Sequence, residues 1–275
     1  MPELPEAETI VRGLRPHLIG RRIADVEVVH SDVLRIAPEA FRPAVTGRAF
    51  EAVERRGKNV LMRLSGGRVL AVNLGMTGRL LPLPAGASDA PDATHPAVRF
   101  LLEGGGALVF DDTRRFGTVE CLGSAEWSAR SARMGPEPLA RGYSARDLHD
   151  ALLRSRSPVR SWLLDQRRIA GVGNIYANEA LYQAGIDPRR PARDVREDEA
   201  RRLHRALRRV LREAIDSGGT TLRDYRTADG EQGRYARALR VYGREGLPCG
   251  RCGSTVERVV LTNRSAFLCP GCQTP

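Results

Sequence analysis

The chain has 275 residues, and its 44 Lys and Arg against 33 Asp and Glu give a formal net charge of +11 and a pI near 10.3. Hydrophobic residues make up 41% of it, which is enough to bury a core, so wholesale disorder is excluded. No apolar run approaches the ~20 residues that a membrane-spanning helix needs. The first twenty residues carry three glutamates and no continuous apolar stretch, which predicts a cytosolic protein without a secretory signal. A balance this basic predicts a polyanionic partner, most commonly nucleic acid.

The first half of the chain is expected to be an N-terminal helix followed by antiparallel strands. Ile10, Leu14 and Leu18 recur at four-residue steps, as on one face of a helix. Short apolar runs separated by glycine turns then predict strands and hairpins, at residues 23–29, 59–64, 69–72, 98–102 and 107–110. The stretch 82–96 is rich in Pro, Ala and Asp and has no periodicity, which predicts an exposed loop.

The pattern becomes helical after residue 138. Ser144 is a suitable N-cap for one helix, and Ser157-Pro158 can open a second. An apolar stripe over residues 197–217 predicts a third, ending at Gly218-Gly219. The sequence therefore predicts an α+β protein with a β domain at 1–133, a linker at 134–143, a helical domain at 144–235 and a small unit at 236–275.

Four of the five cysteines form two Cys-x2-Cys pairs near the C-terminus, Cys249 with Cys252 and Cys269 with Cys272. Two such turns facing each other complete a tetrahedral zinc site without an open position, so we expect one structural zinc ion. Two disulfides are the alternative, which a cytosolic location disfavours. The segments 255–261 and 265–268 between the pairs predict a β-hairpin. Cys121 stands alone and is expected to be a small buried residue.

The opening run, Met1-Pro2-Glu3-Leu4-Pro5-Glu6, combines two prolines with two carboxylates. Removal of Met1 would expose the secondary amine of Pro2. An α-amino group titrates at about pH 8, so part of it is unprotonated and nucleophilic near neutrality. Such an amine can attack a sugar carbon and form an iminium, while the adjacent Glu3 moves protons. The alternative is an ordinary helix N-terminus whose acids interact with the helix dipole.

Four motifs in collinear order resemble one family over the whole chain. They are the Pro2–Glu6 run, residues 171–179 (Gly-Val-Gly-Asn-Ile-Tyr-Ala-Asn-Glu), residues 218–222 (Gly-Gly-Thr-Thr-Leu) and residues 241–244 (Val-Tyr-Gly-Arg). The last of these motifs comes shortly before the four cysteines. Together they are similar to bacterial formamidopyrimidine-DNA glycosylase. The resemblance implies an N-terminal helix with an antiparallel β-sandwich, then a helix-two-turn-helix domain with a zinc β-hairpin.

The same resemblance implies a monomeric DNA repair enzyme with two activities. The family excises oxidised purines, notably 8-oxoguanine and formamidopyrimidines, and cuts the strand by β,δ-elimination; its partner is double-stranded DNA with oxidised bases or abasic sites. By position, Pro2 resembles the family's nucleophile, Glu3 its general acid and base, and Glu6 a second carboxylate of the pocket. Lys58 matches its phosphate-contacting lysine and is the only lysine in the chain.

Further positions match the family's contacts to the opened duplex. An enzyme that acts on a base takes it out of the stack, and other groups occupy the space it leaves. Met76, Arg114 and Phe116 match the residues that do so, and His95 is a further expected DNA contact. Core packing is the alternative for Met76.

Two more DNA contacts are implied in the second half of the chain. Asn174 follows Gly-Val-Gly at the start of an expected helix and matches the phosphate contact of the helix-two-turn-helix. Arg264 matches the arginine of the zinc hairpin that binds phosphates beside the lesion. The segment 221–235 corresponds to the loop that closes over the flipped base.

The sequence departs from the family pattern at two places. Asn73 stands where His is common, and Asp112-Thr113 stands where Asp-Pro is common, which bears on how the opposite base is read. Leu4 fits this branch rather than the endonuclease VIII branch, which commonly has Gly there and prefers oxidised pyrimidines. That branch, and a non-catalytic DNA-binding zinc protein with the same fold, are the alternatives.

Overall fold

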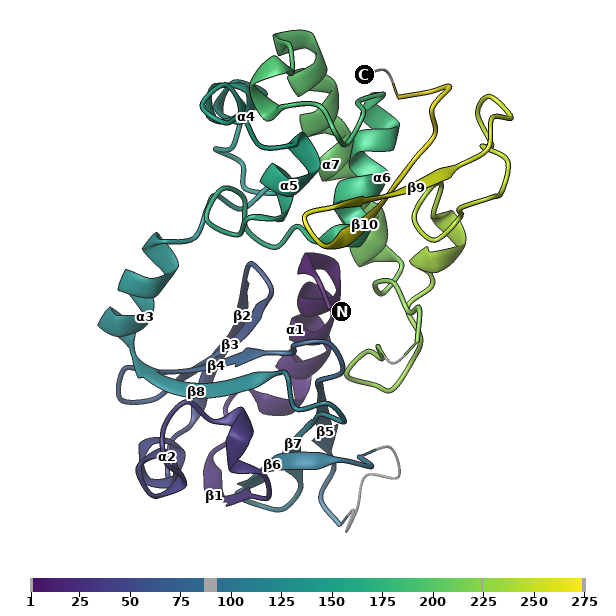
Figure 1. Cartoon of the computed structure of the whole chain (residues 1–275). Coiled ribbons are helices and arrows are strands. Elements are labelled where there is room, and N and C mark those ends of the chain that lie inside the picture. Colours follow the sequence, from purple (N-terminus) through teal and green to yellow (C-terminus); the bar gives the residue numbers. More distant parts are fainter. Residues whose placement is uncertain (1, 87–92, 224, 274–275) are drawn as a thin grey trace. The chain divides into compact units, whose positions relative to one another are not determined.

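A computed structural model describes residues 2–86, 93–223 and 225–273, and the chain divides into two compact units (Figure 1). The first unit contains Met1–Arg133 and Ile215–Arg234, and the second contains Met134–Ala214 and Tyr235–Pro275. Among the described residues, no helix combines the length and apolar character needed to cross a membrane.

The first unit is a β-sandwich with helices. One antiparallel sheet has the order β1 (Ile23–Val28), β6 (Pro96–Leu102), β7 (Ala107–Asp111) and β5 (Arg79–Leu83). The other has the order β2 (Phe50–Arg56), β3 (Asn59–Leu64), β4 (Arg68–Asn73) and β8 (Thr118–Gly123). The largest core cluster draws side chains from both sheets, from α1 (Leu4–Leu18) and from α2 (Pro38–Val45). A 3-10 turn, η1 (Ser31–Val33), precedes α2.

The apolar spacing of α1 explains how the helix joins this core. Ile10, Leu14 and Leu18 are all buried, and they belong to the core cluster. A smaller cluster lies between the second sheet and α3 (Ser124–Ala132), where Trp127 packs with Leu61 and Val69. Both faces of the second sheet are thus covered, which is why β4 is buried along most of its length.

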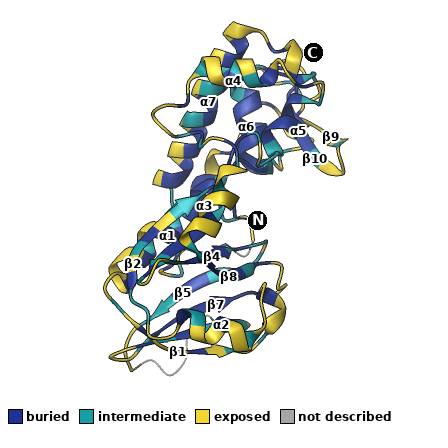
Figure 2. Cartoon of the chain, turned by 90° about the vertical axis from the view of Figure 1, so that its left-hand side faces the viewer, coloured by how far each residue is buried: buried dark blue, intermediate teal, exposed yellow. Residues whose placement is uncertain are grey.

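The second unit is helical. It contains α4 (Ala145–Leu152), α5 (Val159–Leu164), α6 (Asn174–Ala184) and α7 (Glu197–Asp216), whose last two residues belong to the first unit. The 3-10 turn η2 (Ala192–Asp194) precedes α7, and a second one, η3 (Tyr235–Ala238), begins the C-terminal segment. In that segment β9 (Glu257–Leu261) pairs with β10 (Arg264–Leu268). Every residue of α6 is buried except Asn174 and Gln183, so this helix forms the centre of the unit (Figure 2).

Buried polar groups of α6 fix the segments around it. The Glu179 carboxylate accepts hydrogen bonds from the backbone N–H groups of Arg240, Val241 and Tyr242, at 2.9 to 3.1 Å. Burial raises the pKa of Glu179, and these three N–H groups act in the opposite direction. Asn178 Oδ1 accepts from the N–H of Phe267 at 2.8 Å. The chain around the four cysteines is therefore anchored to α6.

The expected elements are confirmed at α1, α4, α5, α7 and the strands named from the sequence, and Ser144 caps α4 through the N–H of Asp147. The expected loop 82–96 was too long at both ends. Pro82 lies in β5, an edge strand where a missing N–H is tolerated, and Pro96 begins β6. Residues 87–92 of that stretch lie outside the described residues. The helices α2 and α3 had no separate prediction.

One boundary differs from the expected domains. The segment 215–234 packs with the first unit, although the sequence placed it with the helical domain that ends at 235. The cause is a set of contacts to α1. Glu6 accepts a hydrogen bond from Thr220, and the Ala228 side chain lies so close to Gly13 that a Cβ there would approach it to 2.8 Å.

Candidate functional site

The N-terminal turn buries its polar residues. Pro2 is buried, and Glu3 and Glu6 are each only 1% exposed. Glu3 precedes the first residue of α1, and its N–H donates to Glu6 Oε2 at 2.8 Å. A buried carboxylate is stable only with such partners, so Glu6 holds the backbone of Glu3 in a defined position.

Glu6 also holds a distant segment of the same unit. Its Oε1 accepts from the Thr220 N–H at 2.8 Å, while the Tyr225 hydroxyl donates to the Gly218 carbonyl at 3.1 Å. Gly219 between them has φ of +86°, and a Cβ there would come within 2.9 Å of the Tyr225 ring. Burial, and then the charge of Glu6, raise the pKa of Tyr225, so this hydroxyl stays protonated. Part of the expected loop 221–235 is thereby tied to the N-terminal turn.

Lys58 lies in the tight turn between β2 and β3. Arg56 pairs with Asn59 across this turn, and Gly57 adopts φ of +60°, which a residue with a side chain rarely does. Lys58 is half-buried. Next to it, the guanidinium of Arg56 donates to the hydroxyl and carbonyl oxygens of Ser131 at 3.0 and 3.2 Å. The turn that carries the lysine is therefore held at its base.

Met76, Arg114 and Phe116 are brought together by two loops that touch. Gly75 has φ of +60°, and a Cβ at that position would lie 2.5 to 2.8 Å from the backbone of Phe116 and Gly117. The Arg114 guanidinium lies over the Phe116 ring, 4.6 Å from its centroid. Phe116 is 57% exposed and Met76 is 40% exposed. Core packing is thus ruled out for Met76, and both apolar side chains are exposed where the two loops touch.

Asp112 organises the loop that carries this group. Its carboxylate is buried, accepts from the Gly117 N–H at 2.8 Å and binds the Thr77 hydroxyl. The neighbouring Thr113 is exposed and lies 3.4 Å from His95 Nδ1. His95 is exposed too, and its own N–H donates to Asp111. The structure therefore places His95 beside the Arg114 loop.

Asn73, one of the departures from the family pattern, has a clear local role. Its Nδ2 donates to Asn59 Oδ1 at 3.0 Å, and its Oδ1 accepts from the Gly75 N–H at 3.1 Å. The side chain thus connects the start of β3 to the turn before Met76.

In the second unit, Asn174 begins α6 and contacts the β9–β10 hairpin directly. Its Nδ2 donates to the Ser265 carbonyl at 3.0 Å. Its Oδ1 accepts from Arg160 at 2.6 Å, and Arg160 also donates to the carbonyls of Leu261 and Ser265 at 2.9 and 2.8 Å. Burial, and then the charge of Arg264, lower the pKa of Arg160 to about 10, so the guanidinium remains charged at neutral pH. Arg160 joins the two elements that carry Asn174 and Arg264.

Arg264 is exposed at the start of β10. The two residues before it, Thr262 and Asn263, have φ of +48° and +59°. Two consecutive positive φ values define the tight type I′ hairpin turn. Thr262 is also held by a hydroxyl contact of 3.0 Å with Ser161. The position of Arg264 is therefore fixed by the hairpin and by α5.

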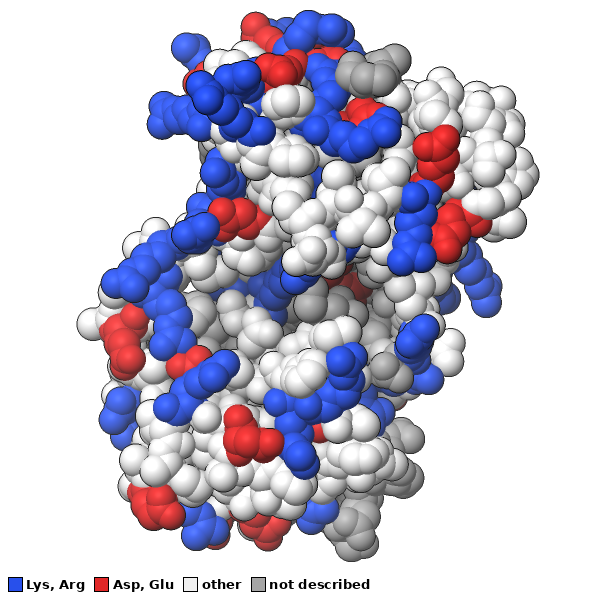
Figure 3. Space-filling model, in the orientation of Figure 1, with Lys and Arg blue, Asp and Glu red and all other residues white. Residues whose placement is uncertain are grey.

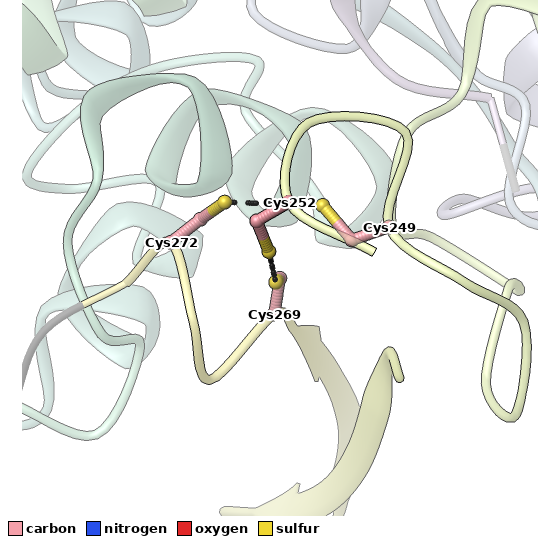
Figure 4. Close-up of side chains that lie close together, drawn as sticks. All are labelled: Cys249, Cys252, Cys269 and Cys272. Atoms are coloured by element: carbon pink, nitrogen blue, oxygen red, sulfur yellow. Dashed lines mark hydrogen bonds between the residues drawn. The ribbon is translucent and has the colours of Figure 1, made fainter. Parts of the chain in front are cut away.

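The four C-terminal cysteines converge from the two knuckles that flank the hairpin (Figure 4). All four Sγ atoms lie within 4.8 Å of one another, with 3.8 Å between Cys249 and Cys272 and 3.4 Å between Cys252 and Cys269. Zn–S bonds of about 2.3 Å in a tetrahedron place sulfurs about 3.8 Å apart, so the donor set fits zinc. With four thiolates the site is closed and structural. Cys121, in the first unit, is buried, and burial raises the pKa of its thiol.

The charge of the surface agrees with an anionic partner. On the face shown in Figure 3, Lys and Arg cover more of both units than Asp and Glu do.

Two features of the site had no counterpart in the sequence analysis. Arg160 occupies an unremarkable position in a short helix, and only the hairpin folded against it reveals its acceptors. The Glu6 bridge joins residues that are more than two hundred positions apart, so no local pattern could reveal it.

Three family models match the chain in order: the formamidopyrimidine-DNA glycosylase N-terminal domain at residues 1–119, its H2TH domain at 134–226, and a zinc finger found in FPG and IleRS at 246–275. A formamidopyrimidine-DNA glycosylase from Chloroflexus aggregans is 44% identical over 274 residues, covering 99% of this chain and 98% of that one. The crystal structure of the MutM (FPG) protein from Thermus thermophilus is 43% identical with a TM-score of 0.88, over 99% of this chain and 98% of that one. A variant of the Lactococcus lactis protein in complex with Fapy-dG-containing DNA is 29% identical with a TM-score of 0.92, over the whole of both chains. The motifs, the fold and these relatives agree: the chain belongs to the formamidopyrimidine-DNA glycosylase family.

Proposed function

We propose that the protein is a base-excision repair enzyme that removes oxidised purines, such as 8-oxoguanine and formamidopyrimidines, from double-stranded DNA and then cleaves the strand as an AP lyase. The family membership supports this proposal, and so do the Lactococcus lactis relatives bound to Fapy-dG-containing and abasic-site-containing DNA. Among the features of this chain, the buried Pro2-Glu3 turn held by Glu6 carries the proposal. Its place of action is the bacterial cytoplasm, where the enzyme acts as a monomer on the chromosome.

The proposed chemistry begins at Pro2. After Met1 is removed, the Pro2 nitrogen attacks C1′ of the damaged nucleotide, and the bond from C1′ to the base breaks. Glu3 is positioned to deliver the proton that the departing base or the opening sugar ring requires. The nitrogen gives up its proton, and its lone pair expels O4′ from C1′. This opens the sugar ring, O4′ takes up a proton from Glu3, and the resulting C1′ iminium makes the C2′ proton acidic.

Strand cleavage follows from this electron sink. Loss of the C2′ proton expels the 3′ phosphate by β-elimination, and loss of a C4′ proton expels the 5′ phosphate by δ-elimination. Water finally hydrolyses the iminium and returns the free Pro2 amine. Glu3 is the proposed proton carrier, and Glu6 keeps the backbone of Glu3 and the segment around Thr220 in place.

The remaining residues are proposed to bind the opened DNA. Lys58 and Arg264 neutralise phosphates and Asn174, at the start of α6, binds one by hydrogen bonding, which fixes the register of the protein on the strand. Met76 and Phe116 wedge into the space left by the flipped base while Arg114 pairs with the orphaned base, and His95 contacts DNA beside them. The exposure of Met76 and Phe116 supports this assignment, because both side chains are accessible to a DNA partner. The expected domains at 1–133, 144–235 and 236–275 would carry catalysis, helix-two-turn-helix binding and the zinc hairpin.

Excision assays on matched duplexes test the proposal. Duplexes contain 8-oxoguanine opposite cytosine, an oxidised thymine, or no lesion, and released base and cut strand are both measured. We expect excision of 8-oxoguanine to exceed that of oxidised thymine, with strand products that bear phosphates at both ends of the gap. The reverse preference would assign the protein to the pyrimidine-preferring branch, and binding without turnover would make it a non-catalytic zinc protein.

A further inference from the structure

Two adjoining pockets in the second unit have no part in the site described above. One, of about 380 Å³, is lined by Tyr182, Gln183, Arg209, Arg240, Gly250 and Arg251. The other, of about 370 Å³, is lined by Gln183, Arg202, Arg205, Ala206 and Arg209. Because they share Gln183 and Arg209, they form one continuous depression, which we call the arginine groove.

The lining of the arginine groove contains five arginines and no acidic residue. Arg202 lies 2.6 Å from Asp198 and 3.9 Å from Glu199 on the preceding turn of α7, and Arg209 lies 2.8 Å from Glu213 on the following turn. Within the part of the chain that the structure describes, no carboxylate oxygen comes within 4.0 Å of the guanidinium of Arg205, Arg240 or Arg251. These three charges remain available to an anionic ligand.

The arrangement of the arginines makes the groove a linear array. Arg202, Arg205 and Arg209 occupy positions i, i+3 and i+7 of α7, so they lie on one helical face over about 10 Å of rise. Like charges with this spacing repel one another and weaken the isolated helix. An anion that binds along the row would remove that repulsion.

The groove lies at the opposite end of α6 from the proposed DNA contact. Asn174 begins this helix and Gln183 is its second-last residue, and they are its two residues that are not buried. Nine residue steps along the helix separate them by about 14 Å. DNA that is bound through Asn174 and Arg264 therefore leaves the arginine groove accessible to another anion.

The lining indicates which class of anion fits. A protein partner gains most of its affinity from apolar and aromatic anchors in fitted pockets. The groove offers only Ala206 and the ring of Tyr182, and the Arg251 guanidinium covers that ring at 4.7 Å from its centroid. A phosphodiester backbone needs no apolar anchor, because closely spaced phosphates bind planar guanidinium groups and release counterions.

We propose that the arginine groove is a second DNA site, which binds the backbone of a segment other than the one held at Asn174 and Arg264. This inference rests on the proposed function for the first segment. One protein could then hold two DNA segments, which would let it move between them without first dissociating into solution.

The test uses the full-length zinc-containing protein, saturated with a short duplex that carries an abasic-site analogue. A second, undamaged DNA with a different fluorescent label, either duplex or single-stranded, is then added at low salt. Sedimentation velocity measures whether both labels move together. The groove variant is R205E/R240E, and the control is R141E/R212E, which makes the same change of charge at exposed arginines of the same unit outside the groove.

We expect the wild-type protein and the control to bind both DNA molecules, and the groove variant to bind the second about tenfold more weakly or worse. Binding of the first duplex and 8-oxoguanine excision should change less than twofold in either variant. The proposal is wrong if no second DNA binds, if both variants lose it equally, or if poly-glutamate occupies the groove and DNA does not displace it. Failure of the proposed function would be separate, because the first duplex would then not bind or not be cut.

Discussion

A single side chain, Glu6, determines how the N-terminal turn is built. Its two carboxylate oxygens accept from the backbone N–H groups of Glu3 and Thr220, both at 2.8 Å, in a site that is almost fully buried. Each of the two N–H donors meets a different oxygen of the carboxylate, so both oxygens have to be acceptors. Glutamate supplies them, whereas glutamine supplies one acceptor and one donor of nearly the same shape.

The variant E6Q should therefore be destabilised by about 1–3 kcal/mol, the cost of one unsatisfied buried donor. Hydrogen exchange should become faster at the amides of residues 217–225, because their connection to α1 is broken. Chemical denaturation and exchange monitored by mass spectrometry measure the two effects. As a control, E51Q alters an exposed position of β2 and should stay within about 0.5 kcal/mol of wild type. Unchanged exchange at 217–225 in E6Q would contradict this role.

At the scale of elements, α5, α6 and the β9–β10 hairpin meet at the buried guanidinium of Arg160. Its three acceptors come from the side chain of Asn174 and from the carbonyls of Leu261 and Ser265. Lysine would keep the charge but lacks the planar fork that reaches several acceptors at once.

Replacement of this side chain in R160M should lower the free energy of unfolding by about 2–4 kcal/mol, because buried acceptors lose their donor. DNA affinity should fall about tenfold or more, since Asn174 and Arg264 are no longer held in one arrangement. R160K should lie between wild type and R160M. R167M, which removes an exposed pair with Asp165, should change stability by less than about 0.5 kcal/mol. Equal behaviour of R160M and R167M in denaturation and fluorescence-anisotropy binding would exclude the proposed link.

The hairpin also depends on the four thiolates. In C252S the most exposed of the four ligands is replaced, so the substitution disturbs packing least. We expect loss of the zinc ion, measured by atomic emission, and a decrease of DNA affinity of about tenfold or more, because folding of such a unit is coupled to metal binding. C121A should retain the zinc ion and the affinity. Full zinc content in C252S would show that the metal is bound elsewhere.

The elements that the sequence predicted are those with a complete local signal. The four-residue spacing of Ile10, Leu14 and Leu18 predicts a helix from the local sequence alone. In the same way, the two Cys-x2-Cys pairs predict a metal site without knowledge of the rest of the fold. By contrast, α2 contains two prolines and α3 is mostly exposed, so neither has a periodic stripe of useful length. The composition of 82–96 predicts a loop at Pro82, whereas its place in β5 depends on pairing with the neighbouring strand β7, which the local sequence does not reveal.

At the scale of the whole molecule, the charge of +11 is divided among several functions. Some arginines stabilise the fold. Arg160 is buried, and the guanidinium of the partly buried Arg190 donates to Glu199 at 2.8 Å. Others stand exposed, including Arg264 and the unpaired members of the arginine groove. Composition alone predicted the class of partner, but it could not separate these roles, because burial and pairing are properties of the folded chain.

The Pro2 amine is proposed to form the covalent intermediate, and peptide mapping of a trapped complex shows which amine reacts. Borohydride is added during cleavage of 8-oxoguanine DNA, and the adduct is located by mass spectrometry. Lys58 is the only lysine, so the amines that can form an iminium are the N-terminal one and Nζ of Lys58. We predict that the adduct lies on the peptide that begins with Pro2, in protein that has lost Met1. An adduct on the peptide that contains Lys58, or none in protein that excises the base, would contradict the account.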